Sequence, residues 1–387
     1  MAQIAGLRGV VPVAAKVSEV VAAPLQLAKA LGAGTVERDP GRAVYRYHQV
    51  FAGPGRTFTR KNLILAVRLT PWSEGSVRPH EATLPAGRDR VLATIRANAG
   101  HVEPVIFGFR DPSSEVERML RKAESARPTL ELTTQDGVIH QLWRVHDAEV
   151  LGKLRHHFAP KKLHVLDGHE RYEAMLAYSE ELAGKHAVSM YSAANYGLAC
   201  LVNIEDPTVV TAARHRIVRG GDIKRDAVLA AAKPHFIVEP IVGAAQDVGK
   251  IFAALGQTIA HQPAFVLALA GEADAWKLTL SPDVSPYAEG VTVHRALQKL
   301  DPVVVDNLFI ARAMPGIELA TEADPSAAIA ALGKGAKAVI VMRPLSVEQI
   351  AHVDELGHLL PAGSTALYPP IAPGLVSFAI DPDEDLV

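Results

Sequence analysis

Residues 161–173 read KKLHVLDGHERYE, and they join a short apolar segment to a polar one. The pattern predicts a strand over 163–166 and a helix over 169–183, with Asp167 and Gly168 between them. Gly168 permits a tight turn that a residue with a Cβ would resist. The first N–H groups of the helix have no partners within the helix, so they point outward with partial positive charge. The turn is therefore suited to binding a phosphate or a carboxylate.

The side chains at this turn extend that chemistry. Arg171 could clamp an anion with two parallel hydrogen bonds, and His169 could donate or shuttle a proton. Asp167 could hold a metal ion or orient a hydroxyl group. The same residues also fit an ordinary strand-to-helix turn with an aspartate cap, a structural salt bridge and solvated charges. The local sequence leaves both interpretations open.

The composition is typical of a folded protein rather than a disordered one, with 49% apolar and 21% charged residues. The 387 residues are enough for about two or three hydrophobic cores. Lys and Arg number 40 and Asp and Glu 42, so no excess of positive charge indicates nucleic acid as a partner. Cys200 is the only cysteine, which excludes a disulfide within the chain and a cysteine-rich zinc site.

No stretch approaches the ~18 consecutive apolar residues of a membrane-spanning helix. The N-terminal segment MAQIAGLRGVVPVAAKVSEVV is interrupted by Lys16 and Glu19, and it lacks the basic start and unbroken apolar run of a signal peptide. We therefore expect a cytoplasmic protein with no membrane partner.

Strand and helix signals change along the chain. The first half contains two hairpin patterns, one over 43–51 and 62–69 and one over 129–134 and 138–145. From residue 222 onward strands and helices alternate, with strands predicted at 236–241, 264–270, 276–280, 317–320 and 336–342 and helices at 222–232, 246–260, 293–300, 301–313, 324–332 and 347–356. This mixture predicts an α+β or mixed α/β fold. We place a boundary near Gly220-Gly221, between regions 1–220 and 221–387.

A second dense cluster of polar side chains lies in residues 76–90, SVRPHEATLPAGRDR, just before a predicted helix. One interpretation is a substrate or phosphate loop that contains Arg78, with Glu81 or His80 as a base. The alternative is a solvated connection whose charges keep the protein soluble. If the first interpretation holds, this loop and the turn at 167–171 should face one cleft, although about eighty residues separate them.

Other segments give weaker signals. Arg214, His215 and Arg216 could meet a phosphate, or they could equally mark an edge strand that carries charge to prevent further pairing. The sequence contains neither a Walker A motif nor a dinucleotide fingerprint. It also lacks a His-Glu-x-x-His zinc motif and a Gly-x-Ser-x-Gly nucleophile elbow.

Several ordered segments together resemble the DUF1015 family of bacterial and archaeal proteins of uncharacterised function. The segments are VSEVVAAP (17–24), VRPHEATLPAGRDR (77–90), NAGHVEPVIFGFRD (98–111), DGVIHQLWRV (136–145), VLDGHERYEAM (165–175) and GSTALYPPIAPGLV (363–376). The fifth matches the family's Asp-Gly-His-His-Arg-Tyr-Glu signature. That signature is similar to the phosphate-binding turn of the ParB/sulfiredoxin-like superfamily, which includes free-serine kinases, sulfiredoxins and nucleotide-dependent DNA clamps.

The resemblance implies a ParB/sulfiredoxin-like core with an additional α/β C-terminal region. It implies a phosphotransferase that uses a nucleotide, ATP or ADP with Mg²⁺, and a small hydroxyl compound as substrate. Nucleotide phosphates would lie on Gly168, His169, Glu170 and Arg171, with Arg78 nearby. Asp167 and Glu170 would hold Mg²⁺. The proposed catalytic groups are Asp167, His169 and Glu81, the last assisted by His80 in accepting the hydroxyl proton.

This chain departs from the family pattern at several positions. Glu170 stands where the family has a second histidine, and Gly363 and Pro370 stand where many members have lysines. The family's Ala-Pro-Pro-Tyr-Asp segment is reduced to Ala23-Pro24-Leu25. These changes keep open a second hypothesis, a non-catalytic regulator that binds a nucleotide or metabolite. A third, a ParB-like nucleic-acid protein, is disfavoured by the balanced charge and the lack of a basic helix-turn-helix segment.

Overall fold

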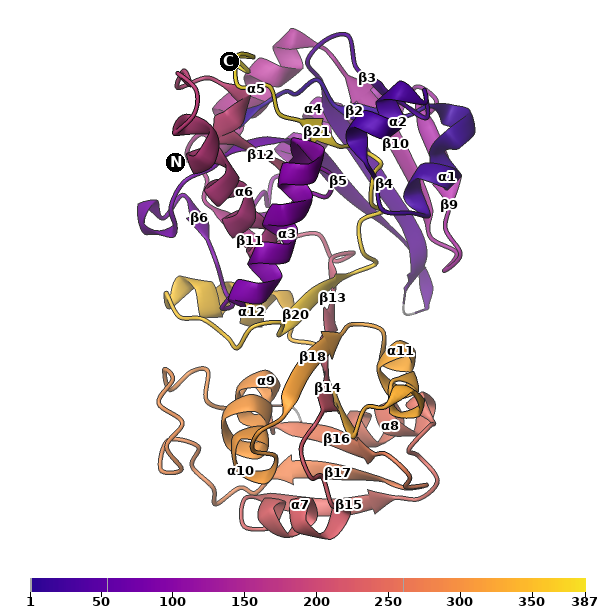
Figure 1. The fold of residues 1–387 in the computed structure, drawn as a ribbon, viewed down its shortest axis with the longest axis vertical. Helices are drawn as coiled ribbons and strands as arrows, with labels where there is room; N and C mark the ends of the chain where they lie inside the picture. Colours follow the sequence, from indigo (N-terminus) through magenta and orange to yellow (C-terminus); the bar gives the residue numbers. More distant parts are fainter. Residues whose placement is uncertain (1, 54, 260) are drawn as a thin grey trace. The chain divides into compact units, whose positions relative to one another are not determined.

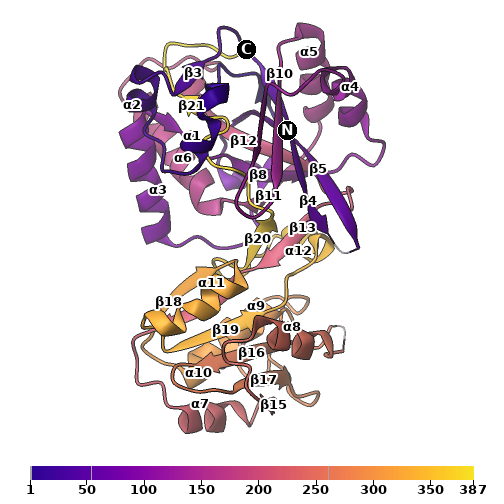
Figure 2. The same ribbon diagram turned by 90° about the vertical axis from the view of Figure 1, so that its right-hand side faces the viewer.

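The computed structural model describes residues 2–53, 55–259 and 261–387. The chain forms two compact units (Figures 1 and 2). Unit 1 contains residues 1–79, 83–210 and 367–387, and unit 2 contains residues 80–82 and 211–366. Unit 2 takes up the chain at Thr211, about ten residues before the boundary that we expected near Gly220-Gly221, and the last segment returns to unit 1.

Unit 1 is built on a nine-stranded sheet. Its two long hairpins are antiparallel, β4 with β5 and β9 with β10, as the alternating sequence pattern predicts. Parallel pairs join β8 to β12 and β6 to β11, so the sheet is mixed. The strand order is β6 (Val77–Arg78), β11 (Leu163–Asp167), β8 (Val105–Phe109), β12 (Tyr196–Asn203), β5 (Arg56–Arg68), β4 (Val44–Gly53), β10 (Ile139–Val145) and β9 (Leu130–Thr133), and β1 (Ile4–Ala5) pairs with β5.

Helices cover both faces of this sheet (Figure 2). On one face α3 (Pro85–Asn98) packs against α6 (His169–Ala183), and on the other α4 (Glu115–Glu124) packs against α5 (Ala148–Phe158). The central strand β12 has almost no polar side chains because both of its faces are covered, and Cys200 packs there as a small buried hydrophobe.

The N-terminal elements form a small satellite layer on unit 1. Strand β2 (Val10–Pro12) pairs with β3 (Val36–Arg38), and α1 (Val17–Val21) and α2 (Leu27–Gly32) lie between them in the chain. Apolar side chains from these elements form their own core. The C-terminal segment contributes β21 (Phe378–Ala379), which pairs with β7 (Gly100–His101) at the end of α3.

Unit 2 contains a six-stranded sheet in which every pairing is antiparallel. The order is β15 (Phe236–Ile241), β17 (Ala275–Leu280), β16 (Ala264–Leu269), β19 (Ala338–Met342), β14 (His215–Arg219) and β18 (Glu318–Glu322). Its apolar core lies between this sheet and helices that include α8 (Val248–Gly256) and α11 (Pro325–Ala330). The remaining elements are β13 (Val210–Ala213), α7 (Arg225–Ala232), α12 (Val347–Glu355) and β20 (Thr365–Tyr368).

One predicted helix of unit 2 is wrong. Residues 293–300 form turns, and a helix begins only with α9 (Asp301–Val304). Leu300 has an extended backbone, and Pro302 lies in the first turn of α9, a position that favours the start of a helix. This helix continues through a π-helical segment, Val305–Ile310, into α10 (Ala311–Ala313).

The mixed α/β class that we predicted is therefore confirmed. Within the described residues, no helix has both the length and the apolar character needed to cross a membrane.

Candidate functional site

The turn between β11 and α6 has the geometry that the sequence predicts. Gly168 is the N-cap residue of α6 and has a left-handed backbone with φ of 95°. As a glycine it offers no side-chain oxygen to the first N–H groups of a helix of 15 residues. A Cβ at this position would also lie 2.7 Å from Nε of Arg171. Both the backbone angle and the close approach of Arg171 therefore require glycine here.

Arg171 lies over this turn and contacts two carboxylates. One guanidinium nitrogen is 3.2 Å from Oδ1 of Asp167, and the other is 3.4 Å from Oε2 of Glu103. The Glu103 side chain is 51% exposed, whereas that of Arg171 is 23% exposed. Nε of Arg171 is buried and has no hydrogen-bond partner in the described part of the chain. Arg171 is thus an ion-pair residue in this structure, and its guanidinium group lies against Gly168.

The other predicted residues of the signature have different surroundings. His169 is buried at 2% exposure. The Glu170 carboxylate lies against the first turn of α3, where a Cβ on Gly87 would be 2.2 Å from its Oε1. Among the described residues, no group of three or more His, Cys, Asp or Glu side chains has an arrangement that could hold a metal ion. Asp167 and Glu170 as ligands of Mg²⁺ stay a prediction.

Two further residues of the signature anchor the turn, and our sequence reasoning gave neither a role in the site. The hydroxyl group of Tyr172 donates to the carbonyl oxygen of Thr70 at 2.8 Å and accepts from its N–H at 3.0 Å. Burial raises the pKa of Tyr172. Trp72 stacks on this ring and donates to Glu173 at 3.1 Å, and Thr83 donates to the same carboxylate at 2.7 Å. These contacts fix the start of α6 against the chain that precedes α3.

The loop 76–90 is divided between the units. Arg78 lies in β6, which pairs in parallel with β11, so its backbone is beside the strand that leads to the turn. Thr83 and Gly87 contact the start of α6, as described above. Residues 80–82 instead belong to unit 2. Glu81 and His169 therefore belong to different units, and their common cleft stays a prediction.

His80 and Glu81 form a buried cluster with the segment before β20. Oε2 of Glu81 accepts hydrogen bonds from the N–H groups of Ser364 and Thr365 at 2.8 and 3.2 Å, and from the hydroxyl group of Thr365 at 3.3 Å. That hydroxyl group is also 2.7 Å from Nε2 of His80. His80 and Glu81 are 1% and 8% exposed, so these two side chains are not part of a solvated connection.

Arg214, which directly precedes β14, and Arg216 of β14 complete this cluster in unit 2. Nε of Arg214 donates to the carbonyl oxygen of Thr365 at 2.9 Å. Arg216 is fully buried, binds both oxygens of Asp306 at 2.9 and 2.8 Å, and donates to the carbonyl oxygen of Gly363. Strand β14, which contains His215 and Arg216, lies between β19 and β18, so the interpretation of residues 214–216 as a charged edge strand is wrong. Asp306, on the π-helical segment, carried no sequence signal that could have identified it.

Two departures from the family pattern have structural counterparts. Gly363 has φ of 63°, and a Cβ there would lie 3.0 Å from Cγ2 of Thr321, so a lysine would be strained. The carbonyl oxygen of Pro370 accepts a hydrogen bond from Gln49 at 2.8 Å within unit 1. Both positions therefore contribute backbone oxygens to polar contacts.

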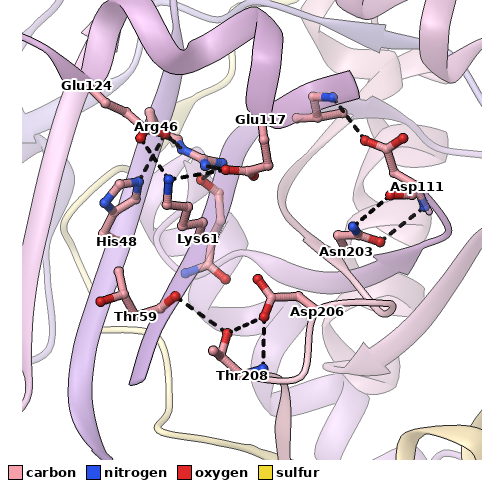
Figure 3. A network of polar contacts seen from close by, with 12 residues as sticks. Arg46, His48, Thr59, Lys61, Asp111, Glu117, Glu124, Asn203, Asp206 and Thr208 are labelled. Atoms are coloured by element: carbon pink, nitrogen blue, oxygen red, sulfur yellow. Dashed lines mark hydrogen bonds and ion pairs between the residues drawn. The ribbon is translucent and has the colours of Figure 1, made fainter. Parts of the chain in front are cut away.

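Unit 1 contains a separate charged network between α4 and side chains of β4 and β5 (Figure 3). Arg46, 1% exposed, binds Glu117 and Glu124, and Lys61 contacts the same two carboxylates. Burial alone would raise the pKa of Glu124, but hydrogen bonds from His48 and Lys61 and the charge of Arg46 lower it below its ordinary value. All of these charges are paired, so this network holds α4 on the sheet.

Three solved structures resemble the chain at low identity. Free serine kinase in complex with AMP is 11% identical, with 81% of this chain and 90% of that chain covered and a TM-score of 0.40. A conserved hypothetical protein from Pyrococcus furiosus is 13% identical over 77% and 89% of the two chains, with a TM-score of 0.39. SbnI from Staphylococcus aureus is 12% identical over 78% and 81%, with a TM-score of 0.37. Similarity of this degree carries no inference about activity.

A search of curated proteins found no match. The model of one family, described as a protein of unknown function, DUF1015, matches residues 13–303, which is most of the chain and includes the loop 76–90 and the turn at Gly168. The chain belongs to the DUF1015 family.

Proposed function

We propose that this protein binds a nucleotide through its phosphates at the Gly168 turn and transfers a phosphoryl group to a small hydroxyl compound. One observation carries the binding step: Arg171 lies over a helix N-terminus whose cap residue, Gly168, has no side chain to satisfy the N–H groups. A phosphate at this position would receive backbone hydrogen bonds and a guanidinium charge together.

The ion pairs of Arg171 are compatible with such a ligand. The contact with Glu103 joins side chains that are 23% and 51% exposed, and pairs of this kind contribute about 0–1 kcal/mol. A charge-assisted hydrogen bond from arginine to a phosphate contributes about 1.5–3 kcal/mol. A phosphate would therefore displace Glu103 from Arg171 rather than be excluded by it.

Mg²⁺ would accompany the phosphates. In nucleotide sites this ion is commonly bound by one or two carboxylates together with phosphate oxygens, so two protein ligands are sufficient. Asp167 lies at the turn itself, next to Gly168, and its side chain is 16% exposed. We propose Asp167 as the principal ligand and Glu170 as the second. The ion would neutralise charge on the transferred group.

The transfer step rests on the resemblance of the Asp-Gly-His-x-Arg motif to that of free-serine kinases. In this proposal Glu81, assisted by His80, accepts the proton of the substrate hydroxyl group, which is serine-like. His169 and Arg78 are the remaining residues of the proposed site. ATP or ADP would be the phosphoryl donor.

One observation favours a second candidate, a regulator that binds a nucleotide or metabolite without catalysis. Oε2 of Glu81 already accepts three hydrogen bonds from Ser364 and Thr365. A carboxylate that is held in this way has a structural role, because it fixes the segment that contains Ser364 and Thr365.

A thermal-shift screen of ATP, ADP, CTP and GTP, each with and without Mg²⁺, tests the binding step. A nucleotide that binds the folded chain raises the unfolding midpoint by mass action. With the nucleotide identified, release of its diphosphate or monophosphate in the presence of serine tests the transfer step. No shift with any nucleotide contradicts the phosphotransferase, whereas a shift without turnover favours the regulator. A shift with CTP alone favours the clamp class instead.

A further inference from the structure

A second polar site lies in unit 1, in a pocket of about 720 Å³ where α4 begins and α5 ends. Helix α4 starts shortly after β8, and the last turn of α5 contains two adjacent histidines. The polar side chains that line the pocket are those of Asp111, Ser113, Glu115, Lys153, His156 and His157, together with Lys161. None of these residues belongs to the proposed nucleotide site.

His157 is the key residue because one of its ring nitrogens lacks a hydrogen bond. The side chain is nine-tenths buried, and its Nδ1 is 3.1 Å from Oε2 of Glu115. Nε2 is buried, has no hydrogen-bond partner among the described residues, and lies 3.8 Å from Oδ1 of Asp111. If Nδ1 donates its proton to Glu115, Nε2 presents a lone pair towards the Asp111 carboxylate.

Asp111 is held in place independently of this histidine. Its Oδ2 accepts a hydrogen bond from the N–H of Val116 at 2.9 Å, in the first turn of α4. Its backbone N–H donates to Oδ1 of Asn203 at 3.1 Å, and its carbonyl oxygen accepts from Nδ2 of Asn203 at 3.0 Å (Figure 3). These contacts leave Oδ1, which has only a long 3.5 Å contact with Ser113, facing His157.

We infer that Nε2 of His157 and Oδ1 of Asp111 bind a divalent transition-metal ion of the zinc type. Zinc–nitrogen and zinc–oxygen bonds of about 2.0–2.2 Å span the 3.8 Å between these two atoms without a large movement. Glu115 fixes the tautomer of the ring through Nδ1, an arrangement typical of histidines that bind zinc. The pocket leaves room for water or a small anion at the remaining coordination positions.

The competing arrangement is a doubly protonated His157 that pairs with Asp111 and Glu115 and binds no metal. The two differ in what they predict for added metal ions, because the ion pair excludes a cation whereas the metal site requires one. Titration of the full chain with Zn²⁺ and with Co²⁺ by calorimetry, near neutral pH and without nucleotide, distinguishes them. Co²⁺ also reports its coordination through visible absorption.

We expect one bound ion per chain. His157→Ala and His157→Gln should each weaken this binding at least tenfold, and Asp111→Asn should do the same while keeping an acceptor for the N–H of Val116. Glu115→Gln should weaken it less. His156→Ala is the matched control, since this neighbour lines the same pocket, and it should leave the affinity within about twofold.

Three results would overturn the inference: no binding by the wild type at millimolar metal, unchanged affinity in both His157 variants, or a loss in His156→Ala equal to that in His157→Ala. The last result would identify adventitious binding by an exposed histidine. Circular dichroism of each variant establishes that it is folded before its affinity is compared.

Discussion

The Gly168 turn of unit 1 and the Glu81 cluster of unit 2 use the same kinds of side chain in opposite ways. Each combines a histidine, a carboxylate and an arginine with backbone N–H groups. In unit 2 the Glu81 carboxylate is buried and accepts those N–H bonds itself, so the cluster is internally satisfied. In unit 1 the cap residue has no side chain, and Arg171 is held by an ion pair with the half-exposed Glu103. Residue types alone do not distinguish a structural polar cluster from a candidate ligand site. The burial of the side chains, and how many of their hydrogen bonds are already made within the protein, do distinguish them.

The largest expected difference between the units is their response to acid. Burial lowers the pKa of His101 to about 3 and of His140 to about 4 in unit 1, and of His215 to about 4 in unit 2. A histidine that is neutral when folded stabilises the protein fully above pH 6.5, and this stability is lost as the pH falls towards the lowered pKa. Each histidine should cost about 1.4 kcal/mol per pH unit between 6.5 and 4.5. Burial also lowers the pKa of His48 in unit 1, so unit 1 should lose stability at least twice as steeply as unit 2.

Tryptophan fluorescence during urea unfolding measures this difference, because Trp143 reports on unit 1 and Trp276 on unit 2. Trp72 is the third tryptophan and also belongs to unit 1, so variants that retain either Trp143 or Trp276 as the single tryptophan separate the two signals. His101→Gln removes one titrating group and should reduce the slope for unit 1 alone. Equal slopes for both probes in the wild-type protein, or an unchanged slope for unit 1 in the His101→Gln variant, would contradict the assignment.

Loss of the buried ion pair between Arg216 and Asp306 should destabilise the Glu81 cluster of unit 2. Arg216→Ala leaves Asp306 without its bidentate partner and the carbonyl oxygen of Gly363 without a donor. Removing one partner of a buried ion pair costs about 3–5 kcal/mol in the free energy of unfolding. The Trp276 signal measures this change. Arg225→Ala, which removes exposed ion pairs with Asp226 and Glu272, is the control and should cost less than about 1 kcal/mol.

At the Gly168 turn of unit 1, loss of the arginine should reduce ligand affinity much more than stability. Arg171→Ala should weaken nucleotide binding by about 1.5–3 kcal/mol, roughly tenfold to a hundredfold in affinity. Its effect on the free energy of unfolding should be about 1 kcal/mol or less, since both of its ion pairs are partly exposed. Isothermal titration with the nucleotide found in the screen measures the affinity. Equal affinities of wild type and variant would rule out Arg171 as a phosphate clamp.

The contrast between the two regions also shows what the sequence could predict. The strand-to-helix turn is local, so Gly168 and the helix over 169–183 could be read directly from adjacent residues. The contact of His80 with Thr365 joins residues 285 positions apart, and no local pattern marks such a pair. The loop 76–90 therefore looked like one cluster, whereas its members belong to two units.

Strand direction in unit 2 illustrates the same limit. The alternation of strands and helices after residue 222 predicted the elements, but it does not specify which strands become neighbours. Strand β14 pairs with β18 and β19, and both pairings are antiparallel. Most of the paired residues are more than a hundred positions apart in the chain. Register and order depend on packing between distant segments, which no single segment encodes.

The smallest expected effect concerns Glu103, and it tests the comparison most directly. If the Gly168 turn is a ligand site, Glu103 competes with phosphate for Arg171, and Glu103→Gln should raise nucleotide affinity about threefold, which is less than 1 kcal/mol. Added salt should shrink the difference between wild type and variant, because it screens exposed pairs.

Glu181→Gln is the matched control, since it removes one negative charge from α6 at an ion pair with Arg96 that lies away from the turn in sequence. It should leave nucleotide affinity unchanged. If both variants tighten binding equally, the cause is net charge rather than release of Arg171. If Glu103→Gln binds no more tightly than wild type, the Arg171–Glu103 pair has a structural role like that of Arg216 and Asp306. The distinction between the two regions then fails at this residue.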